Sequence, residues 1–221
     1  MKLILSALTK FIFGLVLVGA LLFLPAWTLN YPHAWLFLAL LFIPMLIMGI
    51  VMAFKAPELL RKRLNGKEKQ ATQRGVIALS GLIFPAGFII CALDFRFGWS
   101  HVPPVCVIIA AVLFELGYAL YAEVMRENAY LSRTIEVQEG QTVVDTGLYA
   151  MVRHPMYLAT LFMFLPMPII LGSFWGLCPF ALYLVVIVVR ILNEEKVLCA
   201  HLEGYSDYRK RVKYRLFPYL W

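Results

Sequence analysis

Long runs of apolar residues, separated by short polar segments, are the strongest pattern in the chain. A bilayer core of roughly 30 Å is crossed by about 20 apolar residues in helical form. Four runs of about this length lie in the first part of the sequence: Phe11–Leu29, Ala34–Phe54, Val76–Leu93 and Val102–Ala122. Each run predicts one membrane-spanning helix, and the first is too long to be the core of a signal peptide.

A fifth apolar stretch, 157–189, is interrupted near its middle by Gly172 and Ser173. Its halves are too short for ordinary spans, so they predict a short helical hairpin that either barely crosses the bilayer or packs inside the bundle. Counted as two crossings, the hairpin brings the expected number of transmembrane helices to six. The fold class that follows is an all-α integral membrane protein.

The composition supports the same class. Hydrophobic residues make up 62% of the 221 residues and charged residues 15%, against roughly 45–50% and about 25% in soluble proteins. A mean hydropathy of +0.80 cannot be hidden in a soluble core of this size. The four cysteines have neither redox nor metal-type spacing, so no disulfide framework and no metal site are expected.

The net charge of +7 has an uneven distribution along the chain. Nineteen of the twenty basic residues fall on one side of the predicted spans, and only Arg96 falls on the other. Cytoplasmic loops collect lysine and arginine, so both termini are expected in the cytoplasm and nucleic acid is not needed to explain the charge. The membrane would be the inner or plasma membrane of a prokaryote, or the endoplasmic reticulum of a eukaryote.

Two features of the first four spans need separate comment. The loop 55–74 places Leu59, Leu60 and Leu64 among basic residues, which predicts a helical turn lying on anionic lipid; a partner-binding role is the alternative. Glu115 interrupts the fourth apolar run, and an ionisable residue inside a span is a candidate functional residue. Pairing with a lysine, or remaining protonated, is the alternative for Glu115.

Two polar segments that flank the hairpin carry candidate chemistry. In the first, 128–157, the stretch Gln141–Val144 has β-type character and is followed by a turn signal. Arg153, His154 and Pro155 then precede an apolar helix, where proline suits the first turn. Such a helix start directs free backbone N–H groups, and here an imidazole, toward an anionic ligand. Interfacial anchoring by Arg153 and His154 is the alternative.

In the second segment, 190–218, Arg190 and Glu194 stand four residues apart and hence on one face of a helix. An arginine at a membrane boundary can hold a carboxylate or phosphate bidentately. A glutamate beside it can accept hydrogen bonds from an amine or a ribose. A local ion pair between the two side chains is the alternative.

Together these segments resemble a known family. The chain contains, in order, G-x-Y-x-x-x-R-H-P-x-Y at 147–157, the apolar hairpin, R-x-x-x-E-x-x-x-L at 190–198, Y-x-x-Y at 205–208 and a basic stretch that closes in Pro218. This order is similar to that of the isoprenylcysteine carboxyl methyltransferase family, within the wider group of membrane methyltransferases that includes the phospholipid N-methyltransferases. The resemblance covers 128–218.

The resemblance implies a binding site for S-adenosyl-L-methionine built from both segments. The residues that it implies for the cofactor are Gln138, Gln141, Thr142, Val143, Val144, Tyr149, His154, Pro155, Met156, Tyr157 and Glu194. It also implies that Arg190 orients the acceptor, while His154 could accept a proton from an amine acceptor. The expected organisation is a four-span transmembrane region at 1–122 and a catalytic region at 123–221.

The function that follows is methyl transfer to a lipophilic acceptor, with carboxyl O-methylation of an isoprenylcysteine-like or other amphipathic acid ahead of lipid N-methylation. The expected partners are a lipophilic or lipidated substrate that enters from the bilayer, and membrane lipids. A sulfonium methyl is already activated, so transfer needs mainly an in-line nucleophile and exclusion of water. An NADPH-dependent sterol-type reductase and a non-catalytic membrane scaffold are the alternatives.

Overall fold

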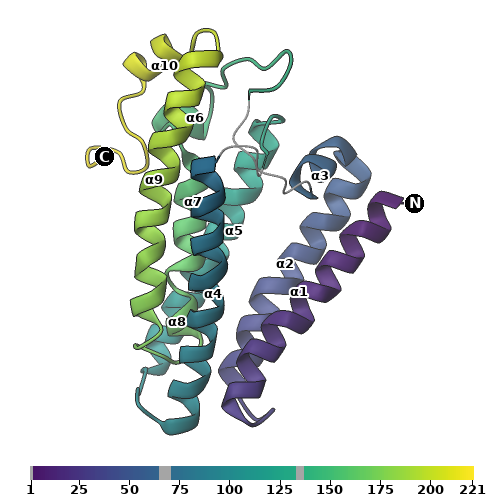
Figure 1. Ribbon diagram of the computed structural model, residues 1–221, viewed down its shortest axis with the longest axis vertical. Coiled ribbons are helices and arrows are strands. Elements are labelled where there is room, and N and C mark those ends of the chain that lie inside the picture. The colour runs from purple at the N-terminus through teal and green to yellow at the C-terminus, as the bar shows by residue number, and fades with distance from the viewer. Residues whose placement is uncertain (1, 65–70, 133–136) are drawn as a thin grey trace.

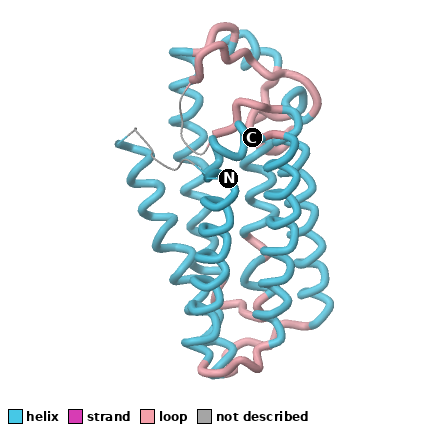
Figure 2. The backbone as a smooth tube through the Cα atoms, turned by 90° about the vertical axis from the view of Figure 1, so that its right-hand side faces the viewer, coloured by secondary structure: helices cyan, strands magenta, loops and turns pink. Residues whose placement is uncertain are grey.

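The computed structural model describes residues 2–64, 71–132 and 137–221, and within these ranges all regular structure is helical (Figures 1 and 2). The predicted all-α class is therefore confirmed. The helices are α1 (Lys2–Ala26), α2 (Pro32–Lys55), α3 (Pro57–Leu64), α4 (Ala71–Phe97), α5 (Pro104–Glu127), α6 (Leu148–Met151), α7 (Pro155–Phe164), α8 (Met167–Ile170), α9 (Leu177–His201) and α10 (Tyr205–Arg211).

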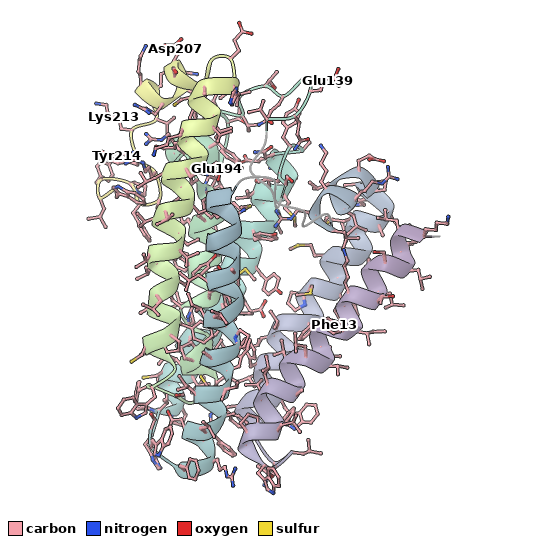
Figure 3. The ribbon with its side chains drawn as sticks, in the orientation of Figure 1. Phe13, Glu139, Glu194, Asp207, Lys213 and Tyr214 are labelled. Atoms are coloured by element: carbon pink, nitrogen blue, oxygen red, sulfur yellow. The ribbon has the colours of Figure 1, made fainter. Side chains whose placement is uncertain are left out.

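Five of these helices are long and apolar enough to cross a membrane: α1, α2, the 78–97 part of α4, α5 and α9. The chain is thus a multi-pass membrane protein, as its apolar runs predict. Phe13 lies on α1 and is 66% exposed, as expected of a lipid-facing residue, because helices satisfy their backbone hydrogen bonds internally and can turn apolar side chains outward. Figure 3 shows three charged residues, Glu139, Asp207 and Lys213, near the end of the molecule that carries α10.

The helix boundaries differ from the apolar runs in instructive ways. The first helix starts at Lys2 and ends at Ala26, whereas the run 11–29 predicts a later start and a later end. The early end coincides with Trp27, whose φ of 58° cannot continue a right-handed helix. The early start shows that polar residues such as Lys2 and Thr9 extend the helix beyond the apolar run.

The last hairpin is less symmetric than its two equal apolar halves predict. Its second arm, α9, is a continuous helix of 25 residues, because the polar residues after Val189 are good helix formers and extend it. Its first arm spans Pro155–Ile170 and is shorter than a full crossing. Pro166 lies between α7 and α8 and cannot donate a helical hydrogen bond. A count of six crossings stays a prediction.

Close helix contacts fix the short arm against the bundle. A Cβ atom at Gly117 of α5 would lie 2.7 Å from Cγ of Met163 on α7, so only glycine permits this approach. Gly87 of α4 likewise meets the ring of Phe180 on α9. In Figure 1, α1 and α2 form a pair that leans away from α4, α5, α7 and α9 toward the end bearing the N-terminus.

A buried polar cluster closes the opposite end of the bundle. The Asp94 carboxylate, 1% exposed, accepts hydrogen bonds from the Ser100 backbone N–H at 2.7 Å and from the hydroxyls of Ser100 and Ser173. The Ser173 hydroxyl in turn accepts the backbone N–H of Gly176 at 3.0 Å. These bonds tie the hairpin turn to the α4–α5 connection, so the first arm reaches this end despite its shortness.

The basic loop after α2 departs from its predicted surface position. Leu59 and Leu60 on α3 are 8% and 6% exposed and pack with Met52 and Met125 in one apolar cluster. The prediction that these leucines lie on lipid is therefore wrong, because they are covered by the protein itself. The remainder of the basic stretch, 65–70, lies outside the described residues, as does the segment 133–136.

Candidate functional site

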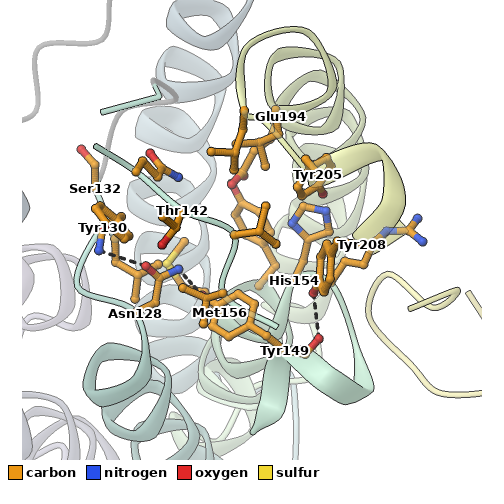
Figure 4. A pocket seen from close by; sticks show the side chains of 18 of the residues that line it. Asn128, Tyr130, Ser132, Thr142, Tyr149, His154, Met156, Glu194, Tyr205 and Tyr208 are labelled. Atoms are coloured by element: carbon orange, nitrogen blue, oxygen red, sulfur yellow. Dashed lines mark hydrogen bonds between the residues drawn. The ribbon is translucent and has the colours of Figure 1, made fainter. Parts of the chain in front are cut away.

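A cleft opens at the end of the bundle where α5 and α9 finish and where the short arm begins (Figure 4). One wall comes from 128–132 and 141–144, the other from α9 and α10, and the floor from the start of α7. The lining residues are Asn128, Tyr130, Leu131, Ser132, Gln141, Thr142, Val143, Val144, Tyr149, Arg153, His154, Met156, Tyr157, Arg190, Glu194, Leu198, Leu202, Tyr205 and Tyr208.

The first wall is held by side-chain bonds to α6. The Asn128 amide donates to the Tyr149 hydroxyl at 2.9 Å, and the Asn128 Oδ1 accepts the Tyr130 backbone N–H at 2.9 Å. The Tyr208 hydroxyl donates to the Tyr149 carbonyl at 2.8 Å and so connects this wall with α10. Residues 141–144 form no strand; the β-type prediction for them is wrong, because no second strand among the described residues pairs with them.

The floor of the cleft is fixed by the C-terminal tail. Pro155 occupies the first position of α7 and His154 is its N-cap residue, as predicted. The backbone N–H groups of Arg153 and His154, however, donate to the carbonyls of Tyr214 and Arg215, both at 2.9 Å. The prediction that this helix start offers its free N–H groups to a ligand is therefore wrong for these two residues, because the tail accepts their hydrogen bonds.

Glu195 organises a buried ion network beneath the floor. Its carboxylate accepts hydrogen bonds from Nε of Arg153 at 2.7 Å and from Nε of Arg215 at 3.0 Å. It also lies 3.4 Å from Nε2 of His154. Arg153, at 7% exposed, also donates to the carbonyls of 212 and 213. The alternative reading of Arg153 as an interfacial anchor is thus wrong, and Glu195 is a site residue that the sequence reasoning missed.

A hydroxyl connects the two residues that stand four apart on α9. The Tyr157 hydroxyl donates to Oε2 of Glu194 at 2.5 Å and accepts Nε of Arg190 at 2.9 Å. Tyr157 is 4% exposed, so this connection is shielded from water on one side while Arg190 and Glu194 line the cleft. The arrangement presents a guanidinium and a carboxylate side by side, held by a shared neutral group.

Tyr205 contributes a buried hydroxyl that has no hydrogen-bond partner among the described residues. The side chain is 4% exposed and lines the cleft beside His154 and Glu194 (Figure 4). Burial, with the two neighbouring carboxylates, raises the pKa of the Tyr205 phenol, so the hydroxyl remains a donor at neutral pH. A buried donor without a partner is costly, which indicates that a ligand or water completes it.

The structure thus gathers most of the expected site residues in one place. Gln141 to Val144, Tyr149, His154, Met156, Tyr157, Glu194 and Arg190 all line the cleft. Gln138 and Pro155 do not line it: the Gln138 amide braces the first wall by donating to the Tyr130 carbonyl at 2.6 Å, and Pro155 is buried at the start of α7. Tyr205 and Tyr208 line it without having been assigned to the site from sequence, and Asn128 also lines it.

The free space at the centre of the cleft is about 100 Å³, below the roughly 300–1,000 Å³ of ligand pockets. The cleft is therefore narrow in this structure. Val137 and Val143 of the first wall pack on Leu202, Tyr205 and other residues of the second through apolar contacts. Tyr208 and Arg211 of α10 add polar bonds to the Tyr149 carbonyl and to Asp145, so apolar and polar contacts together join the two sides of the cleft.

The fold and the cleft define a class: a helical multi-pass membrane protein with a polar, partly buried site at one end of its bundle. Residues 105–203 match the family model described as phospholipid methyltransferase. This region of the chain is therefore similar to the isoprenylcysteine/phospholipid methyltransferase group, and the family resemblance drawn from the sequence is confirmed. No curated protein matches the chain.

The family match has two consequences for the site. It covers α5 to α9, and therefore includes both walls of the cleft except α10 and the tail. The family suggests a membrane methyltransferase that acts on lipid. Methyltransferases of this family generally use S-adenosylmethionine.

Proposed function

We propose that the protein transfers a methyl group from S-adenosyl-L-methionine to the carboxylate of an amphipathic acid, such as an isoprenylcysteine. The observation that carries the proposal is the cleft formed mainly by the family-matched region, where Glu194 and Arg190 share one space with Tyr205 of α10, whose hydroxyl has no partner among the described residues. A cationic, polar cofactor and an anionic acceptor both find a complementary group there.

The residues of the cleft fit the cofactor. Glu194 offers a carboxylate to its ammonium group, and the Tyr205 hydroxyl offers a hydrogen bond that no described residue takes up. Val143, Leu198 and Leu202 supply apolar surface for a flat base. When bound, S-adenosylmethionine supplies a methyl group on a positively charged sulfur, already activated for transfer.

The chain's own part in the reaction is to bind, orient and exclude water. Arg190 holds the acceptor carboxylate, and Tyr157 holds Arg190 through the 2.9 Å hydrogen bond. An ionised carboxylate needs no general base. His154, 4% exposed, lies against Glu195 and forms part of the cleft floor. If the acceptor were instead a lipid amine, His154 would be the residue placed to receive its proton.

The wider arrangement follows from the same proposal. We infer a four-span region at 1–122 and a catalytic region at 123–221, with the substrate entering from the bilayer and membrane lipids surrounding it. The excess of basic residues near the cleft's end supports a cytoplasmic cleft and cytoplasmic termini. The family match favours this proposal over an NADPH-dependent reductase or a non-catalytic scaffold.

The test is calorimetric titration of the detergent-purified protein with S-adenosylhomocysteine and, separately, with NADPH. We expect micromolar binding of S-adenosylhomocysteine that Glu194→Ala abolishes. Glu203→Ala is the matched control, because Glu203 is an exposed carboxylate just beyond α9. Equal affinity in Glu194→Ala and the unaltered protein would exclude Glu194 from the site. Binding of NADPH but not of S-adenosylhomocysteine would support the reductase alternative instead of the methyltransferase.

A further inference from the structure

A second cavity adjoins the cleft on the side of α4. It holds about 250 Å³ and is bounded by α3, α4, α7 and α9. Four of its lining residues, Ser132, Met156, Tyr157 and Arg190, also line the cleft. The two spaces therefore adjoin along these residues, Arg190 among them, where a bound cofactor and a bound acceptor would face each other.

The second cavity has one cationic end and one apolar end. Arg63 and Arg190 lie among its lining residues, which include no aspartate or glutamate in the part of the chain that the structure describes. Phe164 and Val186 form apolar surface. The Tyr183 and Thr160 hydroxyls lie 3.4 Å apart and supply a polar rim between these ends. An anionic head with an apolar tail is the ligand that this lining complements.

Arg63 reaches the cavity from the basic segment that the sequence suggested lies on lipid. Its Nη1 donates to the Ser132 carbonyl at 3.3 Å and lies 3.8 Å from Sδ of Met156. Its guanidinium carbon lies 5.2 Å from the centre of the Tyr121 ring, within the range of a cation–π contact. The guanidinium is thus positioned by three elements before any ligand arrives.

The burial of α3 makes this position durable. Leu59 and Leu60 are covered by α2, α5 and α6 residues, so α3 is held against the bundle next to the cavity. Arg61, two positions earlier, is instead exposed and pairs with Glu58 at 3.3 Å. Two arginines of one short helix therefore have different surroundings, and only Arg63 lines the cavity.

We propose that Arg63 is a second acceptor-binding residue, which with Arg190 holds the oxyanion of the methyl acceptor in this cavity. The inference rests on the proposed function. In the reaction, an acceptor carboxylate oxygen forms a bond to the methyl carbon while the carbon–sulfur bond breaks and its electron pair stays on sulfur. The products are a neutral ester and a neutral thioether, and no proton moves. Loss of the acceptor's charge weakens its attraction to both arginines and favours release.

The experiment compares a charged and an uncharged acceptor analogue on the full chain in detergent. N-acetyl-S-farnesyl-cysteine and its carboxamide share a tail and differ in the charge of the head. We expect the unaltered protein to bind the acid at least about tenfold more tightly, because hydrogen bonds to a charged group are stronger than those to a neutral one. Arg63→Gln should lose most of that preference, and Arg63→Lys should retain part of it, since lysine keeps the charge but not the bidentate geometry.

Two controls separate this proposal from the one on which it rests. Arg61→Gln should behave as the unaltered protein, and Arg63→Gln should keep its affinity for S-adenosylhomocysteine within about twofold, which also shows that it is folded. Equal binding of acid and amide by the unaltered protein, or an unchanged preference in Arg63→Gln, overturns the role of Arg63. Arg63-dependent methylation of phosphatidylethanolamine overturns the carboxylate assignment. Failure to bind S-adenosylhomocysteine at all overturns the proposed function instead.

Discussion

Replacing Tyr205 by phenylalanine should affect the protein alone and its cofactor complex in opposite directions. The Tyr205 hydroxyl is buried, lines the cleft and has no partner among the described residues. Tyr205→Phe removes this hydroxyl and keeps the ring, which packs with Tyr208 and Leu202. A role in packing alone predicts no change in ligand affinity. The stability of the ligand-free protein and its affinity for S-adenosylhomocysteine together test whether the ligand bonds to this hydroxyl.

The magnitudes follow from the missing bond. A buried polar group without a partner costs about 1–3 kcal/mol, and a neutral hydrogen bond contributes about 0.5–1.5 kcal/mol. The substitution should therefore leave the ligand-free protein as stable as before, or stabilise it by up to about 1 kcal/mol. Affinity for S-adenosylhomocysteine should fall by about 2- to 10-fold, since 1.4 kcal/mol corresponds to a factor of ten.

The assay is thermal unfolding in detergent with and without S-adenosylhomocysteine, followed by calorimetric titration. Tyr208→Phe is the matched control, because the Tyr208 hydroxyl donates to the Tyr149 carbonyl at 2.8 Å and its loss should destabilise the ligand-free protein. A Tyr205→Phe protein that unfolds at a lower temperature, or that binds the ligand as tightly as the unaltered chain, would refute the reasoning.

Three further predictions concern the residues that hold the site and one that lies away from it. Glu195→Ala should destabilise the protein by about 3–5 kcal/mol, because it leaves Arg153 buried without its carboxylate; unaltered thermal unfolding would contradict this. Gly117→Leu should prevent close packing on Met163 and lower the yield of folded protein, whereas normal yield and stability would argue against the contact. Glu115→Gln should leave methyl transfer within about twofold, because Glu115 lines a separate groove between α2 and α5; a large loss would return it to the site.

The length of the apolar runs predicts the membrane spans of this protein, because a bilayer imposes a similar length on every crossing helix. The same reasoning fails at polar boundaries. The apolar run ends at Val189, yet α9 continues to His201, since a helix that leaves the membrane meets no physical barrier to continuing. Hydropathy therefore locates the membrane-embedded portion of a helix and not its end.

Charge near a membrane boundary is harder to interpret from sequence. From the sequence, Arg63 and Arg153 are expected at the membrane surface. In the structure, Arg153 is buried with Glu195 and Arg63 lines a cavity. Tertiary contacts between residues far apart in the chain decide these positions: Arg153 contacts the tail, and Arg63 contacts Ser132 and Met156. The motif at 153–157 could be recognised because its members are adjacent, whereas the tail that accepts its N–H groups carries no local signal.

Two adjacent carboxylates on α9 have different surroundings: Glu194 lines the cleft, and Glu195 lies in the buried ion network. Successive helical residues point about 100° apart, so Glu194 faces the cleft with Tyr157 while Glu195 faces Arg153 and Arg215. The buried network joins the tail, α9 and the start of α7, and these segments supply the floor beneath the ligand. The network fixes the start of α7, and Tyr157 of that helix holds Arg190 by the 2.9 Å hydrogen bond. Arg190 is thus positioned through Tyr157 by a segment that buried charge holds in place.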